Sequence, residues 1–546
     1  MSIMFESKAE PIILPERYYH HYFCELLAFV QKHSPHLIGP SEWEFLSAFN
    51  LLTQDAQCLF IRFCNRKGPY FRLDKLTYSE ISDINGSIED LENAHFIVST
   101  HENNLELYRP FTKRELQILF AEYDLNKLSK DAIIELLYEK NGLNRILAEY
   151  QLVLVAKQEE VEFLKMLYFG KYKKQMTEFV IRDVGYVKLA PLDETQFTPW
   201  FIDRTDAMAA FELSKLLRLV RVAISEFSGT TLHEALKLIP WNDYLISIKT
   251  QQIGDQIMLL VGQHLERQKQ PVLAIRYYQL AKKHPARERQ LRIWHKLGQL
   301  ESATQLALEI MKNHWNASEY LFAKDFLDRQ KTRINRSTSQ LLKSANKIDL
   351  YQNTLIKVEE QALSYYKELG FDGIHGENQL WKNLYGLLFW DQLFDQQHGD
   401  YHHPLQRVAS DFYTKSFYMK RKKSIMKRLE SFEQASTLAM LINITFNEKF
   451  GIANPMVQWE EKLSEHLEVM INKIPLVGLK KVLIEMSKNL KDNTTGFPDL
   501  FIWNEHSYHL YEIKSPNDHL SSQQLYWLDF FKKEGIHAEI IKVNFL

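Results

Sequence analysis

The chain has 546 residues, of which 45% are hydrophobic and 25% are charged, and its formal net charge is −2. That composition is typical of a folded multidomain protein and excludes a polycation that binds nucleic acid through its overall charge. The three cysteines form no C-x-x-C array, which excludes a zinc finger and favours a reducing compartment, and no apolar run is long enough to span a membrane.

The first expected domain covers residues 1–110 and carries a basic segment. Helical apolar spacing is present over 18–31 and 41–52, and the segment that follows interleaves basic side chains with Phe63, Tyr70 and Phe71. Such interleaving suits a phosphate backbone with stacking support, although the charged face of an ordinary helix and strand has the same composition. The candidate DNA-binding residues here are Arg62, Arg66, Lys67 and Arg72.

Residues 111–160 are expected to form a small helical module. Thr112-x-x-Glu115 is a capping-box signature that opens one helix, and the segment 125–131 joins it to a second. This arrangement resembles a SAP-type module, which often contacts duplex DNA through lysines, although many helical hairpins have a similar sequence.

The third expected domain, residues 161–370, is almost purely helical after Pro199. The segments 274–281 and 302–308 have similar patterns, which predicts an irregular helical array similar to TPR repeats. Between them lies a basic cluster with Arg287, Arg289 and Arg292. A phosphate-binding pocket needs such residues, and the alternative is a solvated turn between helices.

The last expected domain covers residues 371–546 and begins with an amphipathic helix. Glu377, Trp381, Leu384 and Leu388 fall on one face of that helix, so a carboxylate is in line with a core-facing stripe and needs a partner or a metal. A first-turn glutamate that favours the helix dipole is the alternative. Residues 420–428 read as a basic helix, in which Lys422 is a further candidate DNA contact.

Two short apolar runs, 497–503 and 508–513, flank a polar turn and predict a β-hairpin. With a two-residue loop at 505–506, Asp499 lies opposite Glu512, and alternation along the strand puts Lys514 on the same face. Two carboxylates with open positions suit Mg²⁺ or Mn²⁺, and a neighbouring lysine can orient an attacking water. A hairpin whose charges simply face water is the alternative.

A helix and a strand follow the hairpin. Ser521-x-x-Gln524 is a capping box, Gly535 is placed to close the helix, and 537–543 reads as a last strand. The hairpin carries Pro498-Asp499 and Glu512-Ile513-Lys514, which is the P-D…E-x-K pattern of the restriction-endonuclease-like nucleases. The run from G-F-P-D-L through E-I-K-S-P-N-D-H-L-S-x-x-Q-x-x-W-L closely resembles the VRR-NUC nuclease domain.

Further motifs widen the resemblance to nearly the whole chain. They are A-Q-C-L-F-I-R-F-C-N-R-K, then Y-F-G with T-E-F-V-I-R-D-V-G, then H-G-E-N with L-Y-G-L-L-F-W-D. With the nuclease motif, they are similar to the Fanconi-associated nuclease family. The resemblance implies a multidomain, mostly α protein, with an N-terminal helical DNA-binding region with a SAP-like element, a TPR-like array and a C-terminal α/β nuclease domain.

The resemblance also implies an activity and a site. The family's enzymes are structure-selective, Mg²⁺- or Mn²⁺-dependent DNA nucleases of DNA repair, with 5′ flap endonuclease and 5′–3′ exonuclease activity on flapped, branched or crosslinked DNA. Carried over by motif, the implied metal ligands are Glu377, Asp499, Glu512 and the main-chain carbonyl of Ile513, the motif lysine is Lys514, and the helix glutamine is Gln524. The arginine cluster at 287–292 then becomes a candidate for holding a 5′-terminal phosphate.

The chain departs from the family pattern in two respects. Eukaryotic members carry a cysteine-rich ubiquitin-binding finger, whose cysteines are absent here, so the chain resembles the shorter bacterial form. We therefore expect a cytoplasmic, nucleoid-associated protein, or a nuclear one in a eukaryote. Ser515 and His519 also differ from the family's residues, which leaves the details of DNA contact open.

Two other functions fit the same pattern. One is a junction-resolving nuclease of the same domain class, and the other is a non-catalytic DNA-binding repair scaffold. Asp499, Glu512 and Lys514 are all present, which favours a nuclease over the scaffold.

Overall fold

The computed structural model describes residues 13–99, 103–185, 187–331 and 337–546. The chain divides into two compact units, one made of Met1–Tyr186 with Pro199–Phe211 and the other of Val187–Thr198 with Glu212–Leu546. Among the described helices, none is both long and apolar enough to cross a membrane.

The first unit begins with a helical layer around an aromatic core. Phe45, Phe49, Phe60 and Phe96 pack with ring centroids 4.8–6.4 Å apart. Helices at 18–31 and 41–52 are confirmed, and α8 packs on both α1 and α2. The boundary predicted at 161 is therefore wrong, because α8 completes this layer rather than opening the helical array. The helices are α1 (Tyr18–His33), α2 (Pro40–Leu51), α3 (Gln54–Cys64), α4 (Ile84–Asn93), α8 (Gln158–Phe169) and α9 (Thr177–Asp183).

A three-stranded antiparallel sheet joins this layer to the small helical module. Its order is β1 (Tyr70–Arg72), β3 (Leu152–Val155) and β2 (Ile97–Ser99). The helices α5 (Lys113–Leu119), α6 (Lys130–Glu139) and α7 (Leu143–Glu149) lie in the chain between β2 and β3. The capping box of Thr112 and Glu115 is confirmed at the start of α5. The module is thus an insertion between two strands of one sheet.

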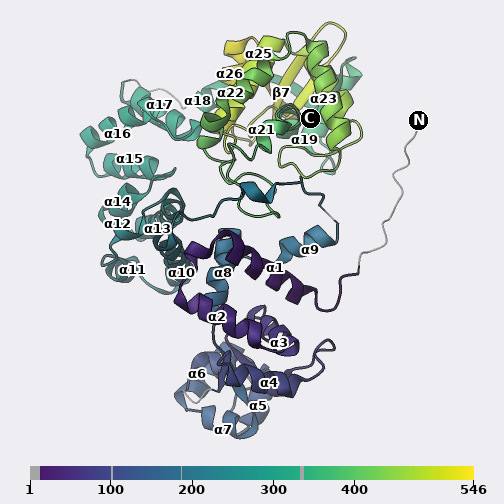
Figure 1. Ribbon diagram of the computed structural model, residues 1–546. Coiled ribbons are helices and arrows are strands. Elements are labelled where there is room, and N and C mark those ends of the chain that lie inside the picture. The colour runs from purple at the N-terminus through teal and green to yellow at the C-terminus, as the bar shows by residue number, and fades with distance from the viewer. Residues whose placement is uncertain (1–12, 100–102, 186, 332–336) are drawn as a thin grey trace. The chain divides into compact units, whose positions relative to one another are not determined.

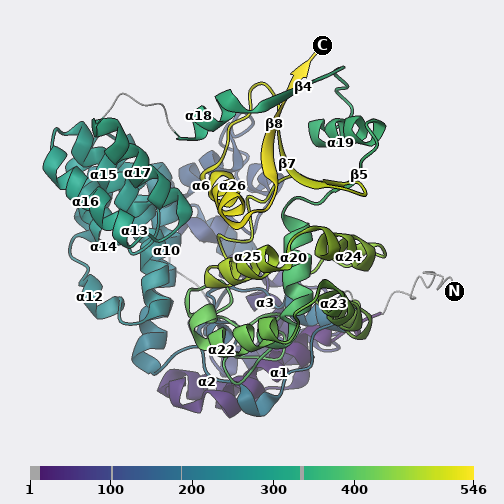
Figure 2. The same ribbon diagram turned by 90° about the horizontal axis from the view of Figure 1, so that it is seen from above.

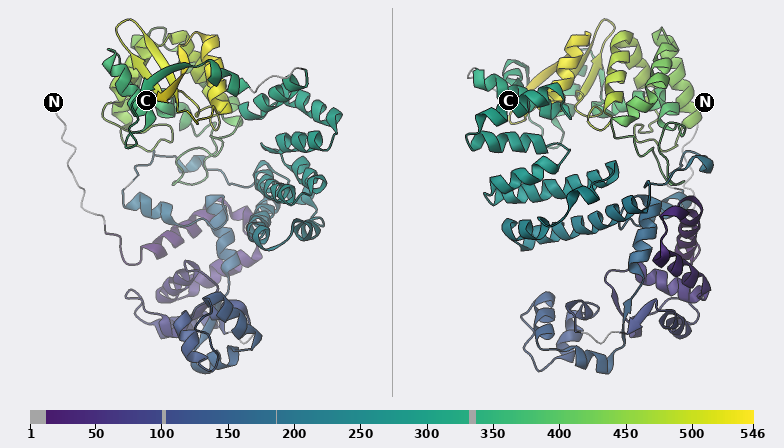
Figure 3. Two further views of the ribbon diagram at one scale, coloured as in Figure 1. Left: turned by 180° about the vertical axis from the view of Figure 1, so that it is seen from behind. Right: turned by 60° about the vertical axis from the view of Figure 1, so that its left-hand side comes forward.

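The second unit begins as a helical array in which consecutive helices pack against each other from α13 to α17 (Figure 3). Gly262 permits a close approach, since a Cβ there would come within 2.6 Å of the Tyr278 ring. The array helices are α10 (Arg204–Glu226), which crosses the unit boundary, α11 (Gly229–Leu236), α12 (Trp241–Tyr244), α13 (Ile248–Arg267), α14 (Pro271–Leu280), α15 (Ala286–Lys296), α16 (Leu300–Lys312), α17 (Ala317–Lys331) and α18 (Ser337–Ser344).

A five-stranded mixed sheet follows in the order β4-β8-β7-β6-β5 (Figure 1). The strands are β4 (Asn346–Leu350), β5 (Asp372–His375), β6 (Leu500–Trp503), β7 (Tyr508–Lys514) and β8 (Ala538–Phe545). β4, β8 and β7 are parallel, whereas β7, β6 and β5 are antiparallel. Leu500 pairs with Tyr511 and Trp503 with Tyr508, so the predicted hairpin register is confirmed.

The predicted boundary at 370 is too late. β4 pairs with β8 along five residues, and α19 (Val358–Glu368) packs on β5, β6 and β7. Both elements lie within the residues predicted for the helical array, yet they complete the nuclease sheet and the core under one of its faces. The nuclease fold therefore begins at β4.

Helices cover both faces of this sheet, with α19 on one side and a thicker helical layer on the other (Figure 2). In that layer Trp381 stacks on Phe497 at 5.2 Å, and Phe497 stacks on Trp527 at 4.3 Å. The apolar stripe of Trp381, Leu384 and Leu388 is fully buried there, as its spacing predicts. The helices are α20 (Glu377–Leu388), α21 (Trp390–Leu393), α22 (Ser416–Glu430), α23 (Ala435–Lys449), α24 (Leu463–Lys473), α25 (Leu476–Lys488) and α26 (Ser522–Glu534).

Candidate active site

The β6–β7 hairpin brings two carboxylates and an ammonium group together at one edge of the sheet. Asp499 directly precedes β6, while Glu512 and Lys514 lie on β7. Lys514 Nζ is 2.8 Å from Glu512 Oε1, and Asp499 Oδ2 accepts a 2.8 Å hydrogen bond from the Ile513 N–H. Glu512 is 1% exposed and Lys514 is 8% exposed. The convergence predicted from strand alternation is therefore present, in a setting largely shielded from water.

The start of α20 is hydrogen-bonded to the same edge of the sheet. The N–H groups of Gly376 and Glu377 both donate to the main-chain carbonyl of Asp499, each at 3.0 Å. Glu377 has φ +38°, an uncommon conformation for a residue with a side chain, and the surrounding hydrogen bonds hold it there. Because β5 ends where β6 begins, antiparallel pairing brings the first residue of α20 beside Asp499.

Gln524 links the following helix to the site. Its Oε1 accepts from the Ser521 N–H at 2.8 Å and its own N–H donates to Ser521 Oγ, which completes the predicted capping box. Its Nε2 donates to Glu512 Oε1. One side chain thus begins α26 and also fixes the orientation of the buried carboxylate, a position that the helix-capping signature identified without revealing this second contact.

Burial and neighbouring carboxylates raise the pKa values of both carboxyl groups. Burial first, and then the charge of Asp499, raise the pKa of Glu512 to about 8. Burial also raises the pKa of Asp499 to about 6, against the opposing effects of the Ile513 N–H and the Lys514 ammonium. The charges of Glu359 and Glu377 add to this increase. The site therefore concentrates more negative charge than Lys514 alone balances.

Glu377 lies beside the pair without joining it. Its carboxylate is exposed and accepts a 2.9 Å hydrogen bond from the Asn378 amide. Within the described ranges, no three His, Cys, Asp or Glu side chains are gathered closely enough to hold a metal ion. The expected trio of Glu377, Asp499 and Glu512 is therefore adjacent but not assembled, because Glu512 is turned toward Lys514 and Gln524.

The sequence reasoning missed Glu359. This residue is half-buried in the first turn of α19, and its charge acts on Asp499. Its only local signal was a pair of acidic residues at a helix start, which usually indicates no more than a favourable helix dipole. Only the packing of α19 on the sheet brings it to the site.

Two of the predicted DNA-binding arginines form ion pairs with carboxylates of the same unit. Arg62 forms an ion pair with Glu80 and lies 4.1 Å from the centre of the Tyr19 ring. Arg72 is 4% exposed, and its guanidinium binds both Asp74 and Glu115. In this structure both guanidinium groups pair with internal carboxylates, so their DNA contacts stay predictions that the pairing does not favour.

Arg66 and Lys67 behave differently. Both are exposed, and both line a cleft of about 680 Å³ beside the inserted helical module. Arg109 and Lys130 line the same cleft. A concave surface with several cations supports the predicted basic patch at these two positions.

Arg287 is also structural. Its Nε and Nη2 donate to the two oxygens of Glu319 at 2.9 and 2.7 Å, and its guanidinium lies 4.0 Å from the centre of the Trp315 ring. Glu319 is fully buried. Arg287 thus neutralises a carboxylate inside the array, and its phosphate role stays a prediction.

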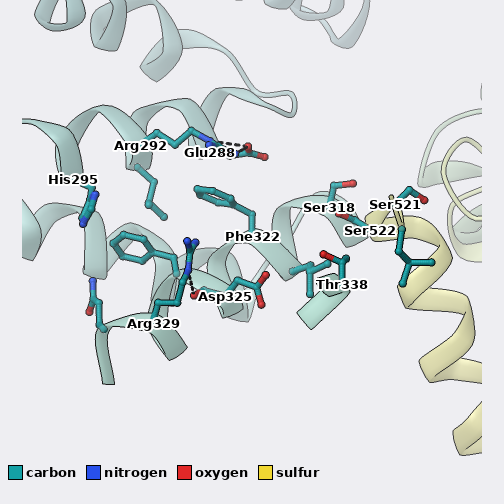
Figure 4. A pocket seen from close by; sticks show the side chains of 15 residues that line it. Glu288, Arg292, His295, Ser318, Phe322, Asp325, Arg329, Thr338, Ser521 and Ser522 are labelled. Atoms are coloured by element: carbon teal, nitrogen blue, oxygen red, sulfur yellow. Dashed lines mark hydrogen bonds and ion pairs between the residues drawn. The ribbon is translucent and has the colours of Figure 1, made fainter. Parts of the chain in front are cut away.

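Arg292 faces a cleft of about 770 Å³ formed by α15, α17 and the start of α26 (Figure 4). It lies over the Phe322 ring and pairs with Glu288, and Arg329 lines the same cleft. Ser521 and Ser522 line the cleft from the nuclease domain. Arg289 instead points toward Glu266, at 3.5 Å, and Lys422 is exposed on α22.

Two family models match parts of the chain. The model described as "FAN1, HTH domain" matches residues 17–98, and the model described as "VRR-NUC domain" matches residues 434–545.

Several relatives match at full or partial length. The Fanconi-associated nuclease 1 homolog of Pseudomonas aeruginosa is 27% identical over 97% of this chain and 96% of its own length. The homolog of Arabidopsis thaliana is 26% identical over 96% of this chain, which spans 66% of that protein. The Homo sapiens protein is 33% identical over 35% of this chain and 19% of its own length.

A crystal structure of paFAN1 bound to 2nt 5′ flap DNA with a gap has the same fold. Its TM-score with this chain is 0.86 at 24% sequence identity, and the match covers 98% of this chain and 100% of the other. A second structure of paFAN1, bound to 1nt 5′ flap DNA with a gap, matches with a TM-score of 0.85.

Proposed function

Because the chain belongs to the Fanconi-associated nuclease family, we propose that it is a structure-selective, metal-dependent DNA nuclease that hydrolyses phosphodiesters in 5′-flap, branched or crosslinked DNA during DNA repair. The observation that carries the proposal is the buried meeting of Asp499, Glu512 and Lys514 at the sheet edge. The flap DNA bound to paFAN1 supports the choice of substrate.

The cation that the donor set suits is Mg²⁺ or Mn²⁺, since all the candidate ligands are oxygens. The half-buried Asp499 raises the pKa of the buried Glu512, and Glu359 and Glu377 raise the pKa of Asp499, so the site concentrates negative charge, which fits a divalent cation. Asp499, Glu512 and the Ile513 main-chain carbonyl would hold it, with Glu377 as a further carboxylate. When bound, the cation polarises the scissile phosphate and neutralises the charge that develops there.

The chain's own groups orient the reaction. Lys514 positions the attacking water and stabilises negative charge on the phosphate. Gln524 keeps Glu512 in place, and the Ile513 N–H keeps Asp499 in place. Such supporting hydrogen bonds preserve a geometry that the reaction depends on.

Substrate contacts are proposed at exposed cations outside this site. Arg66, Lys67 and Lys422 contact the phosphate backbone of the duplex. Arg292, together with Arg329 across the same cleft, holds the 5′-terminal phosphate of the flap. In a bacterium the protein acts at the nucleoid, where its DNA substrate is.

Cleavage of end-labelled DNA tests the proposal. Wild-type protein with Mg²⁺ or Mn²⁺ is expected to cut 5′-flap DNA faster than 3′-flap or four-way-junction DNA, and EDTA is expected to abolish cutting. Asp499→Ala should lose most cleavage and keep flap binding. Preferential cutting of four-way junctions would favour the resolvase alternative, and no cutting with either metal would favour the scaffold.

A further inference from the structure

Asn378, the last residue of the H-G-E-N motif, has a side chain to which the proposed reaction gives no role. It is half-buried at the second position of α20. Its Nδ2 donates to Glu377 Oε1 at 2.9 Å, and its Oδ1 accepts from the Phe497 N–H at 3.1 Å. One amide therefore joins the Glu377 carboxylate to the backbone just before Asp499, although 119 residues separate Asn378 from Phe497 in the chain.

The two partners determine which way round the amide lies. A main-chain N–H is a donor and a carboxylate is an acceptor, so the amide oxygen must face Phe497 and the amide nitrogen must face Glu377. A side chain with only donors or only acceptors cannot serve both partners. Because the amide is neutral, it orients the Glu377 carboxylate without cancelling its charge, which remains available to a cation.

The partner of the amide oxygen is a rigid piece of backbone. The Phe497 side chain is 1% exposed and stacks on Trp381 and Trp527, with ring centroids 5.2 and 4.3 Å away. The next residue, Pro498, has its φ fixed by its ring. The Asn378 amide is therefore anchored on a fixed point, and the place of its nitrogen follows from that anchor.

The Glu377 carboxylate depends on such a bond for its orientation. Glu377 is exposed and has φ +38°, which few residues with a side chain adopt. An exposed glutamate samples several rotamers, and each of them places the carboxylate differently. The hydrogen bond from Asn378 favours one of these rotamers. In that rotamer the charge of Glu377 acts on Asp499, so the carboxylate lies on the side of the catalytic pair.

We propose that Asn378 is a positioning residue of the nuclease site. Its amide, anchored on the Phe497 N–H, holds the Glu377 carboxylate beside Asp499 and so raises the affinity of the site for a divalent cation. Groups that hold a ligand side chain in place contribute about 10- to 100-fold to metal affinity or activity. The inference rests on the proposed function and deepens it, and it gives Asn378 no contact of its own with the cation or with DNA.

Mn²⁺ binding in the absence of DNA measures this role separately from catalysis. Electron paramagnetic resonance of free Mn²⁺, followed while the full chain is titrated, gives the dissociation constant. We expect Asn378→Ala to weaken Mn²⁺ binding about tenfold, because the Glu377 carboxylate is then free to turn away from the site. Asn378→Ser should give the same result, since serine is well suited to the start of a helix but is too short to join both partners.

A double-mutant cycle distinguishes a role through Glu377 from a purely structural one. Glu377→Ala alone should weaken Mn²⁺ binding, and adding Asn378→Ala should change the affinity by less than about twofold, because the carboxylate that Asn378 holds is already gone. If Asn378 instead acts by bracing Phe497 and thereby Asp499, its whole effect will persist in the Glu377→Ala background.

Asn383→Ala is the matched control on the same helix. Asn383 is buried, and its Oδ1 accepts from the Gln379 amide and from the Gln458 N–H at 2.7 and 2.8 Å. Its replacement leaves two donors without their acceptor, so the midpoint of thermal unfolding should fall. Mn²⁺ affinity should stay at the wild-type value, because Asn383 makes its bonds away from the Glu377 carboxylate.

Three results would overturn the proposal. They are wild-type Mn²⁺ affinity in both Asn378 variants, an Asn378 effect that persists without the Glu377 carboxylate, and an equal loss of affinity in the Asn383 control. Failure of the proposed function has a different signature, because wild type would then cut no flap with either metal whatever its Mn²⁺ affinity. Normal flap cutting by wild type together with any of the three results refutes the role of Asn378 alone.

Discussion

Replacing Arg287 with alanine tests whether this buried arginine of the array is structural. The substitution removes both donors from Arg287 to Glu319, whose carboxylate is fully buried. Among the described residues, the bond that this carboxylate keeps is the 2.7 Å hydrogen bond from the Trp315 N–H. Breaking a buried ion pair on one side costs about 3–5 kcal/mol, because an uncompensated charge remains inside. We expect the free energy of unfolding of the array to fall by about that amount.

Arg292 provides the matched comparison. Its side chain is 47% exposed, and it pairs with Glu288 one turn earlier on α15. The Glu288 carboxylate keeps its 3.0 Å hydrogen bond to His284 without Arg292, and i,i+4 ion pairs contribute about 0.3–0.5 kcal/mol, so Arg292→Ala should cost far less stability than Arg287→Ala. If Arg292 holds the terminal phosphate, that variant should lose most of the preference for 5′-phosphorylated over unphosphorylated flaps.

Urea unfolding followed by tryptophan fluorescence measures the first effect, and competition binding with the two flaps measures the second. A compensating Arg287→Met/Glu319→Leu protein should recover most of the lost stability, since removing both charges leaves no buried ion. The reasoning is refuted if Arg287→Ala unfolds at the wild-type urea concentration while losing phosphate preference. That result would mean that Arg287 faces the substrate.

Three further predictions concern the active site and the basic patch. Lys514→Ala should slow the chemical step about 100-fold. It should change little the metal concentration that gives half-maximal cleavage, as single-turnover cleavage over a metal titration will measure. Glu377→Gln should reduce cleavage at least about tenfold without unfolding the protein, as flap cleavage and circular dichroism will establish. Replacing Arg66 and Lys67 by alanine should reduce the slope of log affinity against log salt by about two, since two phosphate contacts are lost.

Each of these has a result that would reject it. A Lys514 variant that needs far more metal but turns over normally would make the lysine part of the cation site. A Glu377 variant with full activity would leave that residue as a helix-start residue only. An unchanged salt slope would mean that DNA does not contact the cleft beside the inserted module. Arg62→Ala is the contrasting variant, and we expect it to lower the free energy of unfolding and to leave the salt dependence of binding unchanged.

Local sequence was sufficient to predict the register of the catalytic hairpin. A two-residue loop and alternating side chains leave one register that buries the apolar face, so the pairing of Leu500 with Tyr511 followed, and with it the meeting of Glu512 and Lys514. The capping boxes at Thr112 and Ser521 were equally local, because their hydrogen bonds span only three residues. The stripe from Trp381 to Leu388 predicted its own burial through helical periodicity.

The limits of the nuclease domain and the role of each arginine depended on tertiary structure. β4 is a short strand within a helical stretch, and its partner is the parallel strand β8. Asp349 of β4 and Asn544 of β8 are paired although 195 residues separate them in the chain. Arg72 and Arg287 look like surface cations in sequence, yet Glu115 and Glu319 bind them inside the fold. Whether a charge is free for DNA is decided by desolvation and pairing across long separations, and neither is encoded in the neighbouring residues.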